Sequence, residues 1–426
     1  MVCKIKYYNY IGDNMKSILE SIKNKKNIEY EELDKYFNDY LNGKVTDSEM
    51  TEVLKAICEY SLTEENIFSL TDIFIKSGDV LPVNKEFIDK HSTGGVGDKT
   101  TLIVLPILAS LGVKISKMSG RGLGYTGGTI DKLESIGVKT DLTKEEFYDS
   151  IEKIGMVISS QTSNLCPMDK KIYALRDVTG TTNSNALIAI SVMSKKIASG
   201  AKQILIDIKV GRGALVNTLK DARELADLMI KIGKKYDRKV VCMLTDMDTP
   251  LGDNIGNKIE VLEVIDILQN RKKNNLYDLC TQMSILMLTM SKGLTKEEAT
   301  KQVNEVLEKK VAYYKFLEYV ESKGGSLDIK LPNKKEIVAL KSGYLKSINS
   351  RLIGESSMLL GAGRKNKNDK IDFNAGVILN KTLGSKVKKG DVLCYYYGKG
   401  KTSLSSAFKI SRLKFNVRNV IIDIIK

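Results

Sequence analysis

The fold predicted for this chain is built around two stretches, Lys90-His-Ser-Thr-Gly-Gly-Val-Gly-Asp-Lys-Thr-Thr101 and Ser119-Gly-Arg-Gly-Leu-Gly-Tyr-Thr-Gly-Gly-Thr-Ile-Asp-Lys132. Residues 90–132 contain nine glycines, more than two tight turns require. A glycine-rich turn that opens a helix presents backbone N–H groups beside the positive helix end, where anions bind. The sequence therefore predicts two anion-binding loops, the first followed by a helix near Leu102 that Thr100 and Thr101 cap.

Around these loops, short apolar runs alternate with amphipathic segments. Strands are predicted at residues 113–118, 156–160, 202–209 and 239–245, and helices at residues 141–154 and 218–235. Such alternation is typical of an α/β domain with a largely parallel central sheet. Its ligand is expected beyond the carboxyl ends of the strands, where the two loops lie.

Other parts of the chain have a helical or a β-like pattern. The predicted architecture is α/β plus all-α, with a discontinuous helical domain of residues 1–78 and 167–200. A larger α/β domain takes residues 79–166 and 201–338. Short β-like runs separated by turn signals predict a small C-terminal β-rich domain at residues 339–426.

Composition limits the kinds of protein this chain can be. No run approaches the roughly 18 apolar residues of a membrane helix, and because residues 1–6 lack the apolar core of a secretory signal, none is expected. Six cysteines without a Cys-x-x-Cys pair favour reduced thiols and a cytoplasmic location. The net charge of +15 fits a lysine-rich surface better than a nucleic-acid-binding protein, because the basic residues are scattered and only Tyr395–Tyr397 offers adjacent aromatic residues. Neither nucleic acid nor membrane is expected as a partner.

Two motif matches need an explanation. Residues 122–127 satisfy the G-x-G-x-x-G pattern of dinucleotide sites, and residues 97–100 resemble the end of a nucleotide-binding P-loop. In the second match Asp98 separates the glycine from the lysine, so the required G-K pair is absent. The extra glycines and the hydroxyl pair around the first match favour a tighter anion cradle. A phosphoribosyltransferase would also need an acidic magnesium site, and no Asp-Glu pair lies near the loops.

The run Ser119–Lys132 closely resembles the signature of thymidine and pyrimidine-nucleoside phosphorylases. Residues 90–98, 173–179 and 194–196 match this family too, and the resemblance extends from about residue 14 to 396. It implies a homodimeric pentosyltransferase that reversibly converts uridine, thymidine or deoxyuridine and phosphate into free base and pentose 1-phosphate, in nucleoside salvage and catabolism. A thymidine phosphorylase restricted to deoxynucleosides is the alternative. The family's plan also implies that the cleft closes between the helical and α/β domains, which excludes water.

The resemblance also implies roles for individual residues. The implied phosphate ligands are Lys90, Ser92, Thr101, Ser119 and Thr129, and the implied pyrimidine-binding group is His91, Tyr173, Arg176, Ser191 and Lys195. Within this group His91, Arg176 and Lys195 are expected to be catalytic, since donors at the base oxygens stabilise the departing anion. As the only histidine of the chain, His91 is expected to change charge near neutral pH, and its polar neighbours Lys90 and Ser92 argue against burial.

Spacing tests whether the pyrimidine-binding residues can meet. Ser191 and Lys195 are four residues apart and share one helix face. Arg176 precedes Ser191 by 15 residues, which in a continuous helix is roughly 22 Å. The run 180–185 therefore predicts a break between two helices, with an N-cap at Asn183 or Ser184.

Some positions depart from the family pattern. Tyr125 stands where histidine is usual, Leu215 where a phenylalanine commonly contacts the base, and Arg212 where a small residue is common. The resemblance implies a looser pocket at Leu215 and an added charge at Arg212.

No cofactor is expected beyond phosphate as co-substrate. Some relatives bind a monovalent cation, and the corresponding positions here are Gly97, Leu251, Asn254 and Glu263. Lys99 stands at the position of the threonine ligand. We expect its ammonium to replace the ion and to pair with Glu263.

Overall fold

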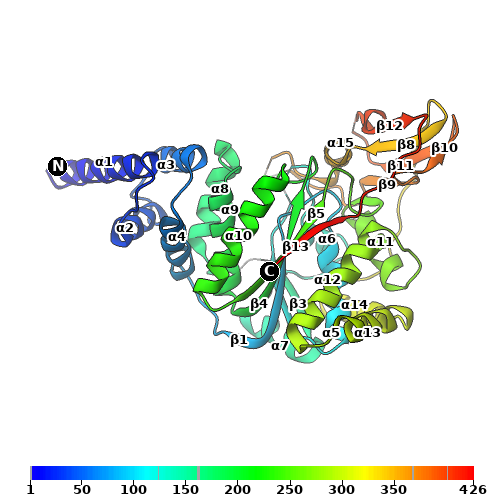
Figure 1. The fold of residues 1–426 in the computed structure, drawn as a ribbon, viewed down its shortest axis with the longest axis horizontal. Coiled ribbons are helices and arrows are strands. Elements are labelled where there is room, and N and C mark those ends of the chain that lie inside the picture. The colour runs from blue at the N-terminus through cyan, green and yellow to red at the C-terminus, as the bar shows by residue number, and fades with distance from the viewer. Residues whose placement is uncertain (1, 123, 161–163, 367–368, 401) are drawn as a thin grey trace.

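The computed structural model describes residues 2–122, 124–160, 164–366, 369–400 and 402–426 (Figure 1). Two sequence segments meet in the helical part on the left of Figure 1. Its helices are α1 (Val2–Lys23), α2 (Tyr30–Leu41), α3 (Asp47–Tyr60), α4 (Glu64–Lys76), α8 (Pro167–Thr179) and α9 (Asn185–Ala198). The predicted break between α8 and α9 is confirmed, and the Ser184 side chain caps α9 by accepting from the Leu187 N–H.

A six-stranded sheet forms the centre of the molecule, in the order β13-β5-β4-β1-β2-β3. Its strands are β1 (Asn84–Ser92), β2 (Ile115–Ser119), β3 (Met156–Ser160), β4 (Ala201–Val210), β5 (Lys239–Asp246) and β13 (Ile421–Ile425). The strands β1 to β5 pair in parallel, and β13 pairs antiparallel with β5. The predicted α/β domain with a largely parallel sheet is confirmed.

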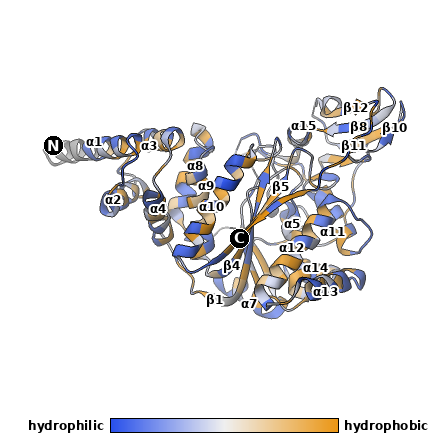
Figure 2. Cartoon of the chain, viewed as in Figure 1, coloured by the Kyte–Doolittle hydropathy of each residue, from blue (hydrophilic) through white to orange (hydrophobic). Residues whose placement is uncertain are grey.

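Helices cover both faces of this sheet. They are α5 (Thr100–Ser110), α6 (Thr129–Glu134), α7 (Lys144–Ile154), α10 (Leu219–Lys235), α11 (Lys258–Leu268), α12 (Asn275–Lys292), α13 (Lys296–Glu308) and α14 (Val311–Ser322). Successive strand residues point to opposite faces. On β4, Leu205 packs with α5 and α11–α14, whereas Ile204 and Ile206 pack with α9, α10 and the N-terminal helices. Hydrophobic residues accordingly gather in the strands and on the inner helix sides in Figure 2.

The predicted β-rich character of the C-terminal part is confirmed, and its strands form two small antiparallel sheets. Its elements are β7 (Lys335–Val338), β8 (Gly343–Ile348), α15 (Ser350–Ser357), η1 (Met358–Ala362), β9 (Gly376–Leu379), β10 (Lys386–Val387), β11 (Val392–Tyr397), η2 (Leu404–Ala407) and β12 (Phe408–Ser411). The chain crosses the predicted boundary at residue 339 in both directions. Strand β6 (Asn254–Gly256) joins the sheet of β9, β11 and β7, and β13 returns to the central sheet. The domain boundaries themselves stay a prediction.

Among the described residues, no helix combines the length and the apolar character needed to cross a membrane.

Candidate active site

Two adjacent strand ends bring the glycine-rich loops together. Strands β1 and β2 are parallel neighbours, so their carboxyl ends lie at the same edge of the sheet. The first loop follows Ser92 and leads into α5, and the second follows Ser119 and leads into α6. The five predicted phosphate ligands therefore lie on the last residues of two neighbouring strands and the first turns of the helices that follow.

Lys90 is completely buried at the end of β1. Its ammonium donates to the Thr100 hydroxyl and lies 3.9 Å from Asp207 Oδ2. The Lys90 ammonium thus has polar partners, Thr100 and Asp207, inside the fold. A buried cation of this kind is suited to bind an anion at the adjoining loops.

Asp98 organises the first loop. Its carboxylate accepts from the Ser92 hydroxyl, from the Thr100 hydroxyl at 2.7 Å and from the Thr100 N–H at 3.2 Å. Burial alone would raise the pKa of Asp98, but Lys90, Lys209 and these hydrogen bonds hold the pKa far below its ordinary value. The predicted caps of α5 were wrong: the helix begins at Thr100, and Asp98 satisfies its first N–H.

Lys117 is a candidate anion ligand that the sequence interpretation missed. It lies on β2, two residues before Ser119, and is buried. Burial, followed by the nearby charge of Lys196, lowers the pKa of Lys117 well below its ordinary value. An anion beside it would offset that repulsion. A lysine alternating with apolar residues in a strand pattern was the available signal.

His91 faces the other side of β1, toward the helical part. It lines a small hollow together with Met118, Leu165, Lys195 and Lys196. Burial, followed by the charges of nearby lysines, lowers the pKa of His91 well below its ordinary value. The direction of this shift favours a neutral imidazole near pH 7, against the expected change of charge near neutral pH. Its Nδ1 atom is buried and has no hydrogen-bond partner among the described residues.

Lys196 connects α9 to β1 beside His91. Its ammonium lies 2.6 Å from Asp89 Oδ2, and both side chains are buried. Sequence reasoning did not identify this ion pair, because its members are 107 residues apart. The pair joins the helical part to the sheet close to the predicted base-binding residues.

On the helical side, the structure brings Tyr173, Ser191 and Lys195 together. The Lys195 ammonium donates to Ser191 Oγ at 3.2 Å and to Asp169 Oδ2 at 2.7 Å, and it lies 5.8 Å from the centre of the Tyr173 ring. Asp169 was missed, although it lies four residues before Tyr173 and seven before Arg176 on one face of α8. The buried carboxylate fixes the direction of the Lys195 ammonium.

Arg176 has a different environment from the other predicted pyrimidine ligands. Its guanidinium is buried and donates to the carbonyl oxygens of Thr181 (3.0 Å), Thr182 (2.9 Å) and Leu187 (3.2 Å). These bonds hold the turn between α8 and α9. In this conformation Arg176 stabilises the break in the helix, and it is not among the residues that line the hollow at His91.

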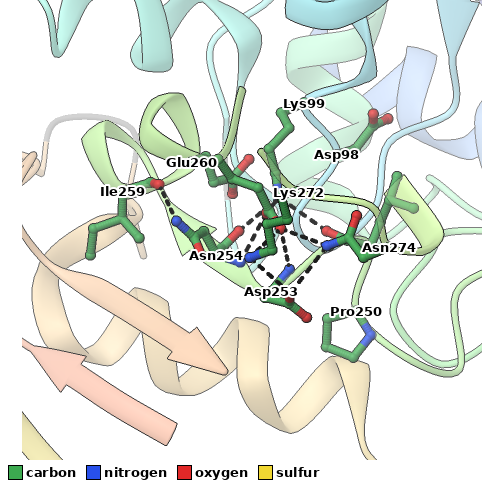
Figure 3. Close-up of polar contacts among 12 residues, drawn as sticks. Asp98, Lys99, Pro250, Asp253, Asn254, Ile259, Glu260, Lys272 and Asn274 are labelled. Atoms are coloured by element: carbon green, nitrogen blue, oxygen red, sulfur yellow. Dashed lines mark hydrogen bonds and ion pairs between the residues drawn. The ribbon is translucent and has the colours of Figure 1, made fainter. Parts of the chain in front are cut away.

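The Lys99 ammonium occupies a cage of oxygen atoms. It donates to Leu251 O (3.0 Å), Asn254 O (2.8 Å) and Glu263 Oε2 (2.8 Å), and both charged side chains are fully buried. Figure 3 shows Lys99 directed into this group from the first loop. The predicted pairing with Glu263 is confirmed. The residues present do not fit a monovalent cation, because an ammonium already has the oxygen ligands that the ion would use.

The other departures from the family pattern lie around the loops. The Arg212 guanidinium is 3.1 Å from Asp248 Oδ1, which directs its charge to that carboxylate. Leu215 is about half exposed. Tyr125 lies in the second loop, and its hydroxyl is 3.5 Å from the Ala214 carbonyl oxygen.

Comparison with known proteins fits this arrangement. The chain is 41% identical over 392 residues to a pyrimidine-nucleoside phosphorylase of Staphylococcus haemolyticus, with 89% of this chain and 90% of the relative covered. It is also 41% identical over 396 residues to one of Bacillus subtilis, with coverage of 90% and 92%. The chain belongs to the pyrimidine-nucleoside phosphorylase family.

Domain profiles agree with this assignment. Residues 84–313 match the glycosyl transferase family a/b domain, and residues 344–415 match the pyrimidine nucleoside phosphorylase C-terminal domain. The anthranilate phosphoribosyltransferase of Thermus thermophilus has a similar fold, with a TM-score of 0.58 at 15% identity. That likeness covers 71% of this chain and 98% of the transferase.

Proposed function

We propose that this enzyme catalyses the reversible phosphorolysis of pyrimidine nucleosides to free base and pentose 1-phosphate. The observation that carries the proposal is the fully buried Lys90 ammonium at the strand edge where both glycine-rich loops begin. Lys117 on the neighbouring strand adds a second buried lysine. The proposed phosphate ligands are Lys90, Ser92, Thr101, Ser119 and Thr129.

The base would lie between the two sides of the site. His91 and Lys195 both line the hollow between β1 and the helical part, and Ser191 contacts Lys195. A phosphate oxygen forms a bond to the anomeric carbon while the bond from that carbon to the pyrimidine nitrogen breaks, and its electrons move to the base. A neutral His91 donates a hydrogen bond to the base, while the Lys195 charge stabilises the leaving anion.

The proposal assigns Tyr173 to one wall of the base site and Arg176 to a less direct role. Because the Arg176 guanidinium is bonded to three carbonyl oxygens, contact with the base requires it to exchange one of them. If Arg176 instead holds the turn that positions Ser191 and Lys195, it can keep all three of these hydrogen bonds.

We also propose that the enzyme is a cytoplasmic homodimer. Light scattering tests the oligomeric state.

We further propose that catalysis needs no monovalent cation. The cage at Lys99 contains its own positive charge, which a bound potassium ion would have to displace. The wild-type rate is then expected to be the same in potassium and choline salts of equal ionic strength.

The decisive experiment is an assay of base release from uridine, deoxyuridine and thymidine, with and without phosphate. Cleavage of all three that requires phosphate supports the broad specificity. Cleavage of the deoxynucleosides alone identifies the deoxy-specific alternative, and no phosphate-dependent cleavage contradicts the proposed function. A Lys90→Met variant is expected to need at least roughly ten-fold more phosphate, because a charge-assisted contact is lost.

A further inference from the structure

Arg364 reaches from the C-terminal part to the second glycine-rich loop. It follows η1, and its side chain is 16% exposed. The guanidinium Nη1 donates to Gly122 O at 3.1 Å, and Nη2 lies 2.8 Å from Asp131 Oδ1. The main-chain oxygen of Arg364 also accepts from the Gly124 N–H at 2.9 Å. One residue thus contacts the loop at three points across more than 230 positions of sequence.

Asp131 completes this arrangement from the opposite side. Its carboxylate is fully buried, and Oδ2 accepts from the Gly122 N–H at 2.6 Å. Both backbone polar groups of Gly122 are therefore held, the N–H by Asp131 and the carbonyl by Arg364. The ion pair between Arg364 and Asp131 closes a triangle around Gly122.

Fixing Gly122 also fixes both ends of the loop. A Cβ atom added to Gly128 would lie 2.1 Å from the Gly122 nitrogen, so these two backbone segments are in direct contact. Gly122 follows Ser119 by three residues, and Gly128 immediately precedes Thr129. The relative position of the two proposed phosphate hydroxyls consequently depends on how Gly122 is held.

The Arg364 charge has a second effect. Asp131 lies two residues after Thr129, in the first turn of α6. A carboxylate at this position repels an anion bound at the Ser119 and Thr129 hydroxyls, and in a buried setting that repulsion is only weakly screened. Arg364 supplies the compensating positive charge at 2.8 Å.

We propose that Arg364 is a positioning residue for phosphate: it holds the second loop in its binding geometry and neutralises Asp131, so that the C-terminal part sets the affinity for phosphate. This inference rests on the proposed function. The proposed role involves no contact between Arg364 and the nucleoside. Its loss should therefore change the phosphate requirement and leave the nucleoside requirement alone.

The test is steady-state phosphorolysis by Arg364→Met, which keeps an unbranched side chain without donors, and by Arg364→Lys. We expect Arg364→Met to raise the KM for phosphate roughly ten-fold or more, with the KM for nucleoside within about two-fold of wild type. Arg364→Lys should be intermediate, since it restores the charge without the two-point contact. Adding Asp131→Asn to Arg364→Met should recover part of the phosphate affinity, because the uncompensated carboxylate is removed.

Lys365→Ala is the matched control, as Lys365 is the exposed neighbouring cation. Its KM for phosphate should equal that of wild type. The inference is overturned if Arg364→Met keeps the wild-type phosphate KM, if Lys365→Ala raises it equally, or if the nucleoside KM rises in parallel. Should Arg364→Met fail to fold, a wild-type phosphate KM in Arg364→Lys overturns it alone. If the proposed function itself is wrong, the wild-type protein will show no phosphate-dependent cleavage of nucleosides, which is a different result from any of these.

Discussion

The two glycine-rich loops lie side by side at one sheet edge but are anchored in different ways. The first loop is held by its own Lys99, whose ammonium is inserted into a cage formed by Leu251, Asn254 and Glu263. The second loop is held from outside by Arg364, which remains partly exposed. The first anchor is an electrostatic element of the core, and the second is a contact between separate parts of the molecule.

This difference predicts different consequences of mutation. Removing one partner of a buried pair leaves an uncompensated charge and mainly costs stability. Removing Arg364 also leaves a buried carboxylate, Asp131, but this charge lies two residues after the proposed phosphate ligand Thr129, so we expect the loss to appear first in the affinity for phosphate. Mutations at the anchor of the first loop should therefore mainly lower the free energy of unfolding. Mutations at the anchor of the second loop should mainly raise the KM for phosphate.

The largest expected effect comes from Lys99→Ala. We expect the free energy of unfolding to fall by about 3 kcal/mol, because Glu263 stays buried and, among the described cations, Lys272 at 3.1 Å is the one that still pairs with it. Potassium or ammonium chloride should restore stability to this variant, since the vacated oxygen cage fits a monovalent cation, whereas choline chloride should not. Urea unfolding measures both effects.

Lys272→Ala is the control for this prediction, because Lys272 contacts the same carboxylate from a partly exposed position. It should lose less stability than Lys99→Ala and show no specific response to potassium. Wild-type stability in Lys99→Ala would show that the cage is not an anchor.

The next largest effect is the loss of stability at acidic pH that Glu263 causes. Burial by itself would raise the pKa of Glu263, but Lys99 and Lys272 lower it from 4.5 to about 2. Because the folded value lies below the unfolded one, this stabilisation is complete above pH 4.5 and is lost as the pH falls from 4.5 toward 2. A Lys99→Met/Glu263→Gln variant should lose less stability over that interval in urea unfolding. If the free energy of unfolding falls equally with pH in wild type and in this variant, Glu263 is not the group whose protonation destabilises the protein.

A smaller effect is expected at His91. As its folded pKa is depressed, the imidazole should stay neutral while the unfolded chain titrates near 6.5, and stability should decline as the pH falls below that value. The single histidine gives one imidazole signal in proton NMR, which should keep its neutral position from about pH 8 to 6. A titration midpoint near 6.5 in the folded protein would refute this.

The His91→Asn variant should be less active than wild type in phosphorolysis. Full activity of this variant would remove His91 from the mechanism.

The smallest effect is expected from Arg212→Ala beside the first loop. Its pair with Asp248 is about half exposed, and such pairs contribute roughly 0.2–1 kcal/mol. Thermal unfolding should therefore shift only slightly, in contrast with Lys99→Ala. If Arg212→Ala loses as much stability as Lys99→Ala, the proposed difference between buried and exposed ion pairs is wrong.

Local sequence rules predicted the elements of the site and failed at its long-range contacts. The break before Ser184 followed from helix geometry, because Arg176 and Ser191 are too far apart for one helix. Asp169 was missed although its spacing to Tyr173 placed it on the same face. The contact of Lys90 with Asp207 was not predicted, because Asp207 comes from a different strand.

The glycine-rich loops, the alternation of strands and helices, and the family resemblance could all be recognised in the amino-acid sequence. These features depend on local periodicity and on residues close together in the chain. Which charges are compensated became visible in the folded chain: Lys196 by Asp89, Lys195 by Asp169, and Asp131 by Arg364. The physical reason is that a charge can be buried only beside a partner, and the fold brings those partners from distant segments.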